Sequence, residues 1–127
     1  MDPIVRAALV HYQFEIAHPF LDGNGRLGRL LITLMLINDG VLHSCLFYPS
    51  FQFKKNRSEY YRQLTSVRER GTYEEWIEFF CNSLLESAED SVGSLKNLVD
   101  LHNRSTATIT ENLGRTAANG QRLLGIL

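Results

Sequence analysis

The segment HPFLDGNGRLGRLL, residues 18–31, constrains the fold of this chain more than any other. It connects the amphipathic stretch VRAALVHYQFEIA to a stretch that is almost wholly apolar. Pro19 disfavours the helical conformation of His18, so we expect the first helix to end near Ala17. The second helix should begin at Asn24 and, because it is apolar on nearly every face, other helices should enclose it. The sequence therefore predicts a loop that faces the first turn of a buried helix.

This loop and the following helical turn carry groups that bind phosphate. The first turn of a helix has unpaired N–H groups and the positive end of the helix dipole, and Gly23 and Gly25 let its backbone approach an anion. Arg26 and Arg29 are three residues apart, so both guanidinium groups can contact further phosphoryl oxygens. Histidine is a common general base, and His18 is placed to accept a proton from an attacking hydroxyl.

Asp22 adds a carboxylate beside the predicted phosphate site. That charge is unfavourable next to bound phosphate unless a divalent cation such as Mg²⁺ lies between them. The sequence therefore predicts nucleotidyl or phosphoryl transfer at a metal-assisted polyphosphate site. The glycines also fit the dinucleotide fingerprint G-x-G-x-x-G, but that fingerprint follows a strand, whereas a helix is expected here. The alternative for His18 is a structural histidine.

Residues 18–29 resemble the signature of the Fic family, H-P-F-x-D/E-G-N-G-R-x-x-R, at every fixed position. The resemblance implies an all-α fold with a Fic-type helical bundle core, and transfer of AMP from ATP to a Ser, Thr or Tyr hydroxyl of a target protein. It implies that His18 is the general base, that Asp22 is the Mg²⁺ ligand, and that Phe20 anchors the loop in the core. The implied ATP- and phosphate-binding residues are Asp22, Gly23, Asn24, Gly25, Arg26, Leu27, Gly28 and Arg29.

The segment KKNRSEYYRQL, residues 54–64, is similar to the family segment whose helix closes over the adenosine. The resemblance implies that Tyr60 and Tyr61 bind adenosine, with Tyr61 the better candidate for contact with adenine. Arg68 stands where some relatives have an asparagine that contacts the nucleotide, and we include it in the adenosine site. The alternative for both tyrosines is that they are ordinary core aromatics.

The resemblance predicts a Fic-like core over residues 1–104. Family members carry upstream helices and a β-hairpin flap that positions the target, and residues 1–17 are too few to form them. The alternative to an adenylyltransferase is therefore a catalytically impaired nucleotide-binding Fic module, or a fragment that needs a partner or a missing N-terminal segment. The tail, residues 105–127, resembles a remnant of a winged helix-turn-helix whose recognition helix is interrupted at Asn119-Gly120, so DNA binding is not expected.

Composition limits the remaining possibilities. The 127 residues carry a net charge of −1, which provides no general attraction for nucleic acid or an anionic membrane. Cys45 and Cys81 match no zinc or redox spacing and are expected to be buried thiols in a reducing compartment. The apolar run after Gly28 is too short to span a bilayer. We expect a bacterial, cytoplasmic protein that makes no membrane contact, with a homodimer possible.

The rest of the chain is expected to be helical. The predicted helices span residues 3–16, 24–38, 55–69 and a last stretch from 72 towards 101. Between the second and third helices, Pro49 should interrupt regular structure. The apolar residues of this connector are expected to fill the core, and they are Leu46, Phe47, Pro49, Phe51 and Phe53.

Overall fold

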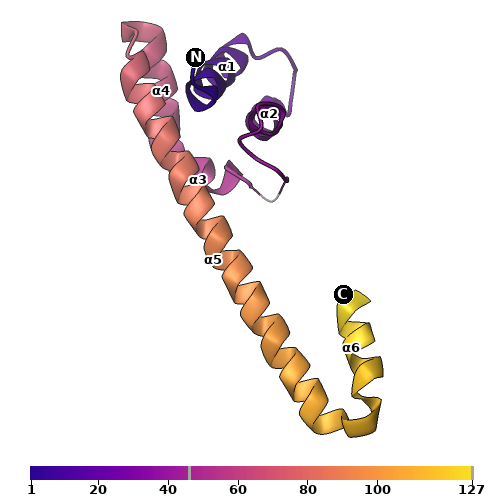
Figure 1. Ribbon diagram of the computed structural model, residues 1–127. Coiled ribbons are helices and arrows are strands. Elements are labelled where there is room, and N and C mark those ends of the chain that lie inside the picture. The colour runs from indigo at the N-terminus through magenta and orange to yellow at the C-terminus, as the bar shows by residue number, and fades with distance from the viewer. Residues whose placement is uncertain (46, 127) are drawn as a thin grey trace. The chain divides into compact units, whose positions relative to one another are not determined.

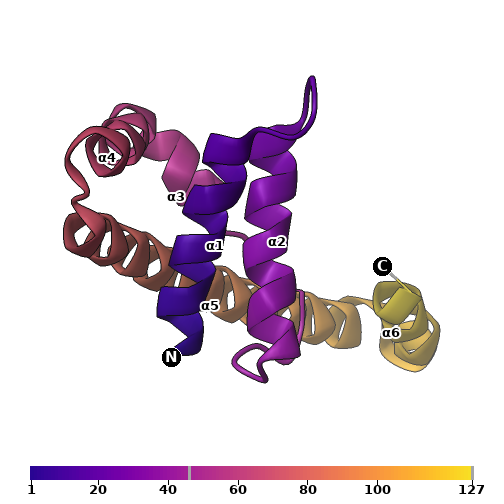
Figure 2. The same ribbon diagram turned by 90° about the horizontal axis from the view of Figure 1, so that it is seen from above.

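The computed structural model describes residues 1–45 and 47–126. Every regular element among these residues is a helix, which confirms the predicted all-α class (Figures 1 and 2). The prediction for Leu46 lies outside the described residues. In chain order the elements are α1 (Pro3–Ala17), α2 (Asn24–Asn38), α3 (Ser50–Lys55), α4 (Arg57–Arg70), α5 (Tyr73–Leu113), the 3₁₀ turn η1 (Gly114–Thr116) and α6 (Ala117–Ile126).

Helix α1 begins and ends at residues that the sequence indicates. The Asp2 carboxylate caps its first turn by accepting from the N–H groups of Ile4 at 2.8 Å and Val5 at 3.2 Å. The helix ends at Ala17, as predicted, and His18 follows in the left-handed conformation with φ 44°. His18 is the only non-glycine residue with positive φ among the described residues. This conformation turns the chain away from α1 at the start of the loop.

Helix α2 lies beside α1 and covers the predicted range, Asn24–Asn38 (Figure 2). The prediction that α2 is enclosed is wrong. Ile32 and Leu36 are buried, whereas Leu30 and Leu34 are each about half exposed. Since the neighbours of α2 within the described residues contact one side of it, only that stripe of apolar side chains enters the core.

The connector after α2 contains a short helix, α3, that the sequence did not predict. Pro49 precedes it with φ −69° and ψ −12°, a conformation that begins a helix as readily as it ends one. Phe47, Pro49 and Phe53 are buried as expected, but Phe51 is 64% exposed. Two residues of α-helix turn through about 200°, so Phe51 and Phe53 lie on opposite faces of α3.

The core of the first part of the chain surrounds Trp76 of α5. Its side chain is fully buried, and its indole Nε1 donates to the Ala8 carbonyl of α1 at 2.9 Å. The rings of Tyr60 and Phe80 pack against the indole, with centroids 6.0 and 5.8 Å from that of Trp76. Phe53 packs against Phe80, with ring centroids 5.8 Å apart. These aromatic side chains join α1, α3, α4 and α5 into one core.

The chain divides into two compact units, Met1–Ser91 and Val92–Leu127. In the second unit α6 approaches the end of α5 closely at Gly120, where a Cβ would come within 2.8 Å of the Ile109 and Leu113 side chains. The prediction of a break at Asn119-Gly120 is wrong, because α6 runs through both residues and the glycine permits close helix contact. The expected core limit at residue 104 falls inside α5 and stays a prediction, as does the winged-helix remnant.

The two cysteines differ in burial. Cys81 is partly buried, but Cys45 is exposed on the loop that follows α2, so the expectation of two buried thiols is wrong for Cys45. Within the described residues, no helix combines the length and the apolar character that crossing a bilayer requires.

Candidate functional site

The loop between α1 and α2 is held by the side chain of Asn24, which is almost fully buried. Its Oδ1 accepts from the Phe20 N–H at 2.9 Å and its Nδ2 donates to the Phe20 carbonyl at 2.5 Å. The Phe20 ring is 52% exposed, so the prediction that it anchors the loop in the core is wrong. The Phe20 backbone is anchored instead, because a buried amide that bonds both backbone groups fixes the loop without its side chain.

The first turn of α2 remains open to a ligand. Gly23 precedes the helix with φ 84°, and no side chain caps the N–H groups of the first helical turn. A Cβ on Gly25 would come 3.1 Å from Nη1 of Arg29, so the missing side chain leaves room for that guanidinium over the helix terminus. Arg29 Nε donates to Ser50 Oγ at 3.1 Å, which fixes the guanidinium from α3. Ser50 was not among the predicted site residues.

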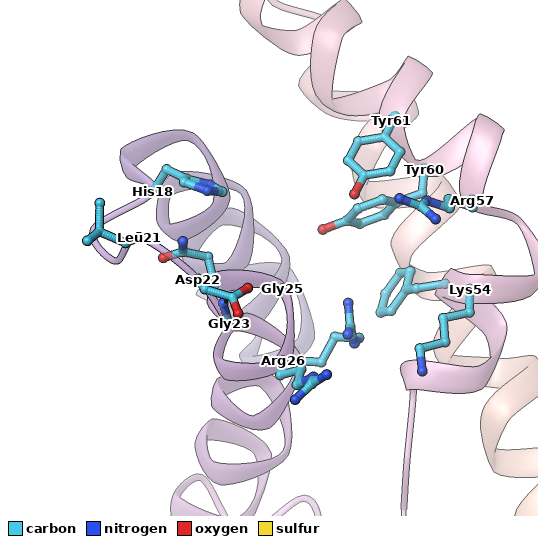
Figure 3. A pocket seen from close by; sticks show the side chains of 13 residues that line it. His18, Leu21, Asp22, Gly23, Gly25, Arg26, Lys54, Arg57, Tyr60 and Tyr61 are labelled. Atoms are coloured by element: carbon cyan, nitrogen blue, oxygen red, sulfur yellow. Dashed lines mark hydrogen bonds between the residues drawn. The ribbon is translucent and has the colours of Figure 1, made fainter.

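These groups border one cavity of about 510 Å³ between the loop, α2, α3 and α4 (Figure 3). His18, Asp22 and the first turn of α2 lie on one side, and Tyr61, Arg57 and Lys54 lie on the other. The structure therefore brings together most of the predicted site. The lining residues are His18, Leu21, Asp22, Gly23, Asn24, Gly25, Arg26, Arg29, Phe53, Lys54, Arg57, Tyr60 and Tyr61.

Three predicted site residues do not line this cavity. Leu27 is 42% exposed, and Gly28 is buried. Both follow Arg26 on α2, and the helical rotation places them on other faces. Arg68 borders a separate cavity of about 250 Å³, which shares His18, Gly25 and Tyr61 with the larger one.

Gly28 packs against α1 and leaves room for two polar side chains there. A Cβ at this position would collide with Oε1 of Glu15 and would come 3.0 Å from Cε1 of His11. Burial raises the pKa of the Glu15 carboxyl, while the charges of Arg29 and His18 oppose that shift. The glycine therefore allows α1 to bring a carboxyl close to the predicted catalytic residues.

His11 joins this region to α4. Its Nε2 lies 3.0 Å from the hydroxyl of Tyr60, and both side chains are buried. Burial, the largest cause, lowers the pKa of His11 to about 4, and the Arg29 charge acts in the same direction. Burial also raises the pKa of Tyr60, so both rings are neutral at physiological pH. Tyr60 lines the cavity but belongs to the core, as the alternative interpretation of the sequence held.

Tyr61 presents more of its surface to the cavity than Tyr60 does. Its ring is 52% exposed, and the Arg57 guanidinium carbon lies 5.6 Å from the ring centroid. This distance is suited to a cation–π contact. Tyr60 packs edge-on against the Tyr61 ring with centroids 5.3 Å apart. Tyr61 is therefore the tyrosine whose ring remains available to a ligand.

The donor set fits a magnesium ion only if phosphate supplies further ligands. Asp22 is the single carboxylate that lines the cavity, and no group of three His, Cys, Asp or Glu residues gathers anywhere in the described chain. Mg²⁺ commonly uses one or two carboxylates together with substrate phosphates and water. The Asp22 carboxylate accepts from the Gly23 N–H at 2.7 Å, which orients it at the helix terminus.

Comparison with known proteins agrees with this geometry. A model of the Fic/DOC family matches residues 1–36, which include His18 and the glycine-rich turn. Protein adenylyltransferase fic-1 of Caenorhabditis briggsae is 35% identical over 96 residues, which cover 76% of this chain and 18% of that protein. This chain belongs to the Fic/DOC family.

Two further relatives carry related names. Protein adenylyltransferase fic-1 of Caenorhabditis elegans is 34% identical over 100 residues, covering 79% of this chain and 18% of the relative. Protein adenylyltransferase Fic of Drosophila ananassae is 41% identical over 69 residues, covering 54% of this chain and 13% of the relative. The chain thus spans less than a fifth of the length of these curated Fic/DOC relatives, all of which are eukaryotic. A bacterial origin stays a prediction.

The Fic/DOC model match ends before α3, so the second wall of the cavity lies beyond it. That wall contributes Phe53, Lys54 and Arg57, none of which was predicted as a site residue. The available signal was the basic run at the start of KKNRSEYYRQL. It carried no fixed spacing that would separate a ligand contact from a solvated face.

Proposed function

We propose that this chain provides the nucleotide-binding and catalytic core of a protein adenylyltransferase, which transfers AMP from ATP to a hydroxyl side chain of a target protein. One observation carries the proposal. A single cavity brings His18 and Asp22 together with an uncapped helix terminus and the Arg26 and Arg29 guanidinium groups. The names of the Fic/DOC relatives support the same reaction.

The phosphates of ATP would lie at the first turn of α2. No side chain caps the first turn of α2 after Gly23, and the helix dipole favours negative charge there. Arg26 and Arg29 would contact phosphoryl oxygens at the helix terminus and those that extend beyond it. Asp22 would hold Mg²⁺, which neutralises phosphate charge when bound.

His18 would act on the acceptor. Its imidazole takes the proton of the target hydroxyl as the hydroxyl oxygen bonds to the α-phosphorus. The bond between the α-phosphorus and the oxygen that bridges to the β-phosphate breaks, and its electron pair leaves with pyrophosphate. The products are an AMP-modified hydroxyl and pyrophosphate. The geometry at the end of α1 supports this role because His18 borders the phosphate cavity without forming part of its helix terminus.

The adenosine would lie towards α4. Tyr61 offers an exposed ring for contact with the base, and Tyr60 supports that ring from the core. Arg68 lies at the adjoining smaller cavity, where it would contact the outer edge of the nucleoside. Two cavities that share Tyr61 and His18 can accept a base and phosphates on the two sides of these residues.

A second candidate is a nucleotide-binding Fic module whose acceptor site is completed by a partner or by further chain. The exposure of the cavity rim favours this candidate. Leu21 is fully exposed and the Phe20 ring is half exposed, so both apolar side chains are available for contact beside His18. A homodimer and a target protein are both possible sources of such a contact, and the cytoplasmic location stays a prediction.

Substitution of His18 separates the two candidates. We expect His18→Ala to abolish transfer of radiolabel from the α-phosphate of ATP, including transfer to the chain itself, because the acceptor proton has no base. Its ATP affinity, measured by calorimetry with Mg²⁺, should stay within about twofold, since the imidazole does not hold the phosphates. His43→Ala, at an exposed histidine outside the cavity, is the matched control.

Each outcome of this experiment decides between the candidates. ATP binding without transfer by the unaltered chain would favour the nucleotide-binding module. Transfer that persists in His18→Ala would remove His18 from the mechanism. Failure of the unaltered chain to bind ATP would overturn both candidates.

A further inference from the structure

The wall of the cavity opposite the helix terminus carries two cationic side chains with no role in the proposed mechanism. Lys54 is in the last turn of α3 and Arg57 is in the first turn of α4. Both side chains are exposed, and both line the cavity that contains Arg26 and Arg29 (Figure 3). The cavity is therefore lined by two lysine or arginine side chains on each wall and by one carboxylate, that of Asp22.

Neither Lys54 nor Arg57 is paired with a carboxylate in the part of the chain that the structure describes. Arg62 of α4 provides the contrast, since its guanidinium donates to both carboxylate oxygens of Glu59, at 2.8 and 2.6 Å. Arg57 instead lies over the Tyr61 ring, which holds the guanidinium at the cavity and leaves its N–H donors free.

Helix stabilisation does not explain the position of Lys54. A lysine near a helix C-terminus interacts favourably with the negative end of the helix dipole. Lys54 and Lys55 both lie in the last turn of α3 and both have this interaction. Only Lys54 lines the cavity, because consecutive helical residues point in directions about 100° apart. The ammonium of Lys54 is therefore available to an anion bound there.

We propose that Lys54 and Arg57 bind the two outer phosphates of the nucleotide, from the side opposite Arg26 and Arg29. This inference rests on the proposed function and extends it to recognition of the leaving group. When the bond to the α-phosphorus breaks, negative charge accumulates on the pyrophosphate that leaves. The cations on α3 and α4 stabilise that charge as it forms.

The arrangement predicts discrimination by phosphate number. ATP and inorganic pyrophosphate both present groups to the α3–α4 wall, which we define as Lys54 and Arg57. AMP has only the phosphate that occupies the helix terminus, so it cannot reach this wall while it remains bound there. Loss of the wall should therefore weaken the binding of pyrophosphate and ATP but not the binding of AMP.

The test compares two double variants of the complete chain by calorimetry with ATP, pyrophosphate and AMP in the presence of Mg²⁺. Lys54→Gln with Arg57→Gln removes the wall, and Lys55→Gln with Arg62→Gln removes the same charge from neighbouring positions outside the cavity. The first variant should bind ATP and pyrophosphate about 10- to 100-fold more weakly than the second. AMP affinity should differ by less than about twofold between them.

Two results would overturn the inference. One is equal affinity of both double variants for pyrophosphate, and the other is an equal loss for AMP and ATP, which would indicate a general charge effect. All four side chains are exposed or partly exposed, so both variants should fold like the unaltered chain, as circular dichroism would check. If the unaltered chain binds ATP and the wall variant matches its control, this inference fails and the proposed function stands. If the unaltered chain binds none of the three, the proposed function fails too.

Discussion

The two walls of the cavity offer different groups to an anion. One wall, the α2 wall, is formed by Gly23 and the first turn of α2. It presents backbone N–H groups, which Gly23 and Gly25 expose and the buried Asn24 holds in place. The α3–α4 wall presents only the ends of two long side chains, Lys54 and Arg57. Backbone groups require particular residues at particular spacings, whereas a flexible cation can reach the same anion from several positions. The α2 wall should therefore position phosphate, and the α3–α4 wall should mainly attract it.

The largest expected effect tests this difference directly. Arg26→Ala with Arg29→Ala should weaken ATP by at least about 100-fold, because it removes two guanidinium groups from the helix terminus where the phosphates converge. AMP should also weaken, unlike its expected response to loss of the α3–α4 wall. Calorimetry measures both, and Arg62→Ala is the control for charge. If the variant lost affinity for ATP but kept full affinity for AMP, it would respond like the α3–α4 wall variant. That result would contradict the proposed difference between the two walls.

The next effect concerns the buried contact that joins the walls. His11 packs against Gly28 of α2 and bonds Tyr60 of α4, and burial lowers its pKa from 6.5 to about 4. Below pH 6.5 the unfolded chain binds a proton at His11 that the folded chain does not bind until about pH 4. The contribution of His11 to stability is therefore complete above pH 6.5 and is lost as the pH falls towards 4, by about 3 kcal/mol in total.

Urea unfolding at several pH values measures this effect. His11→Gln should flatten the rise of the unfolding free energy between pH 4 and 6.5, whatever its effect at neutral pH. The raised pKa of Glu15 acts in the opposite direction, since the folded chain keeps that proton longer than the unfolded chain. His43→Ala should leave the profile unchanged. Equal slopes in His11→Gln and the unaltered chain would show that the ring is not buried as a neutral group.

The smallest effect tests how closely α1 and α2 must approach. Gly28→Ala should destabilise the fold by about 1–3 kcal/mol, because the new methyl group meets the Glu15 carboxyl and the His11 ring. Gly93→Ala is the matched control in α5, where a Cβ meets nothing within 4 Å and should stabilise the helix by up to about 1 kcal/mol. Thermal unfolding compares them. A Gly28→Ala protein at least as stable as the unaltered chain would contradict the close packing.

The contrast between the walls also explains what could be predicted from the sequence. The bounds of α2 were predicted correctly because the glycines at its start and the Asp39-Gly40 pair after it are local signals. The cluster of His18, Asp22 and Arg29 follows from the same short segment, and the structure brings it to one cavity. Local spacing was sufficient where one loop and one helical turn supply the groups.

The remaining features depend on contacts between distant parts of the sequence. Ser50 meets Arg29 because the connector folds into α3, whose Phe53 is buried in the core. No residue spacing along the chain encodes these partners.

The position of Trp76 has a practical consequence for any spectroscopic study of the chain. It is the sole tryptophan, and the aromatic core of Met1–Ser91 encloses it completely. Its emission will therefore shift to longer wavelength when this unit unfolds and exposes the indole to water. Val92–Leu127 contains no indole, so its melting leaves no comparable signature in intrinsic fluorescence. A fluorescence melt of the intact protein would consequently report the unfolding of Met1–Ser91, while Val92–Leu127 contributes no tryptophan signal.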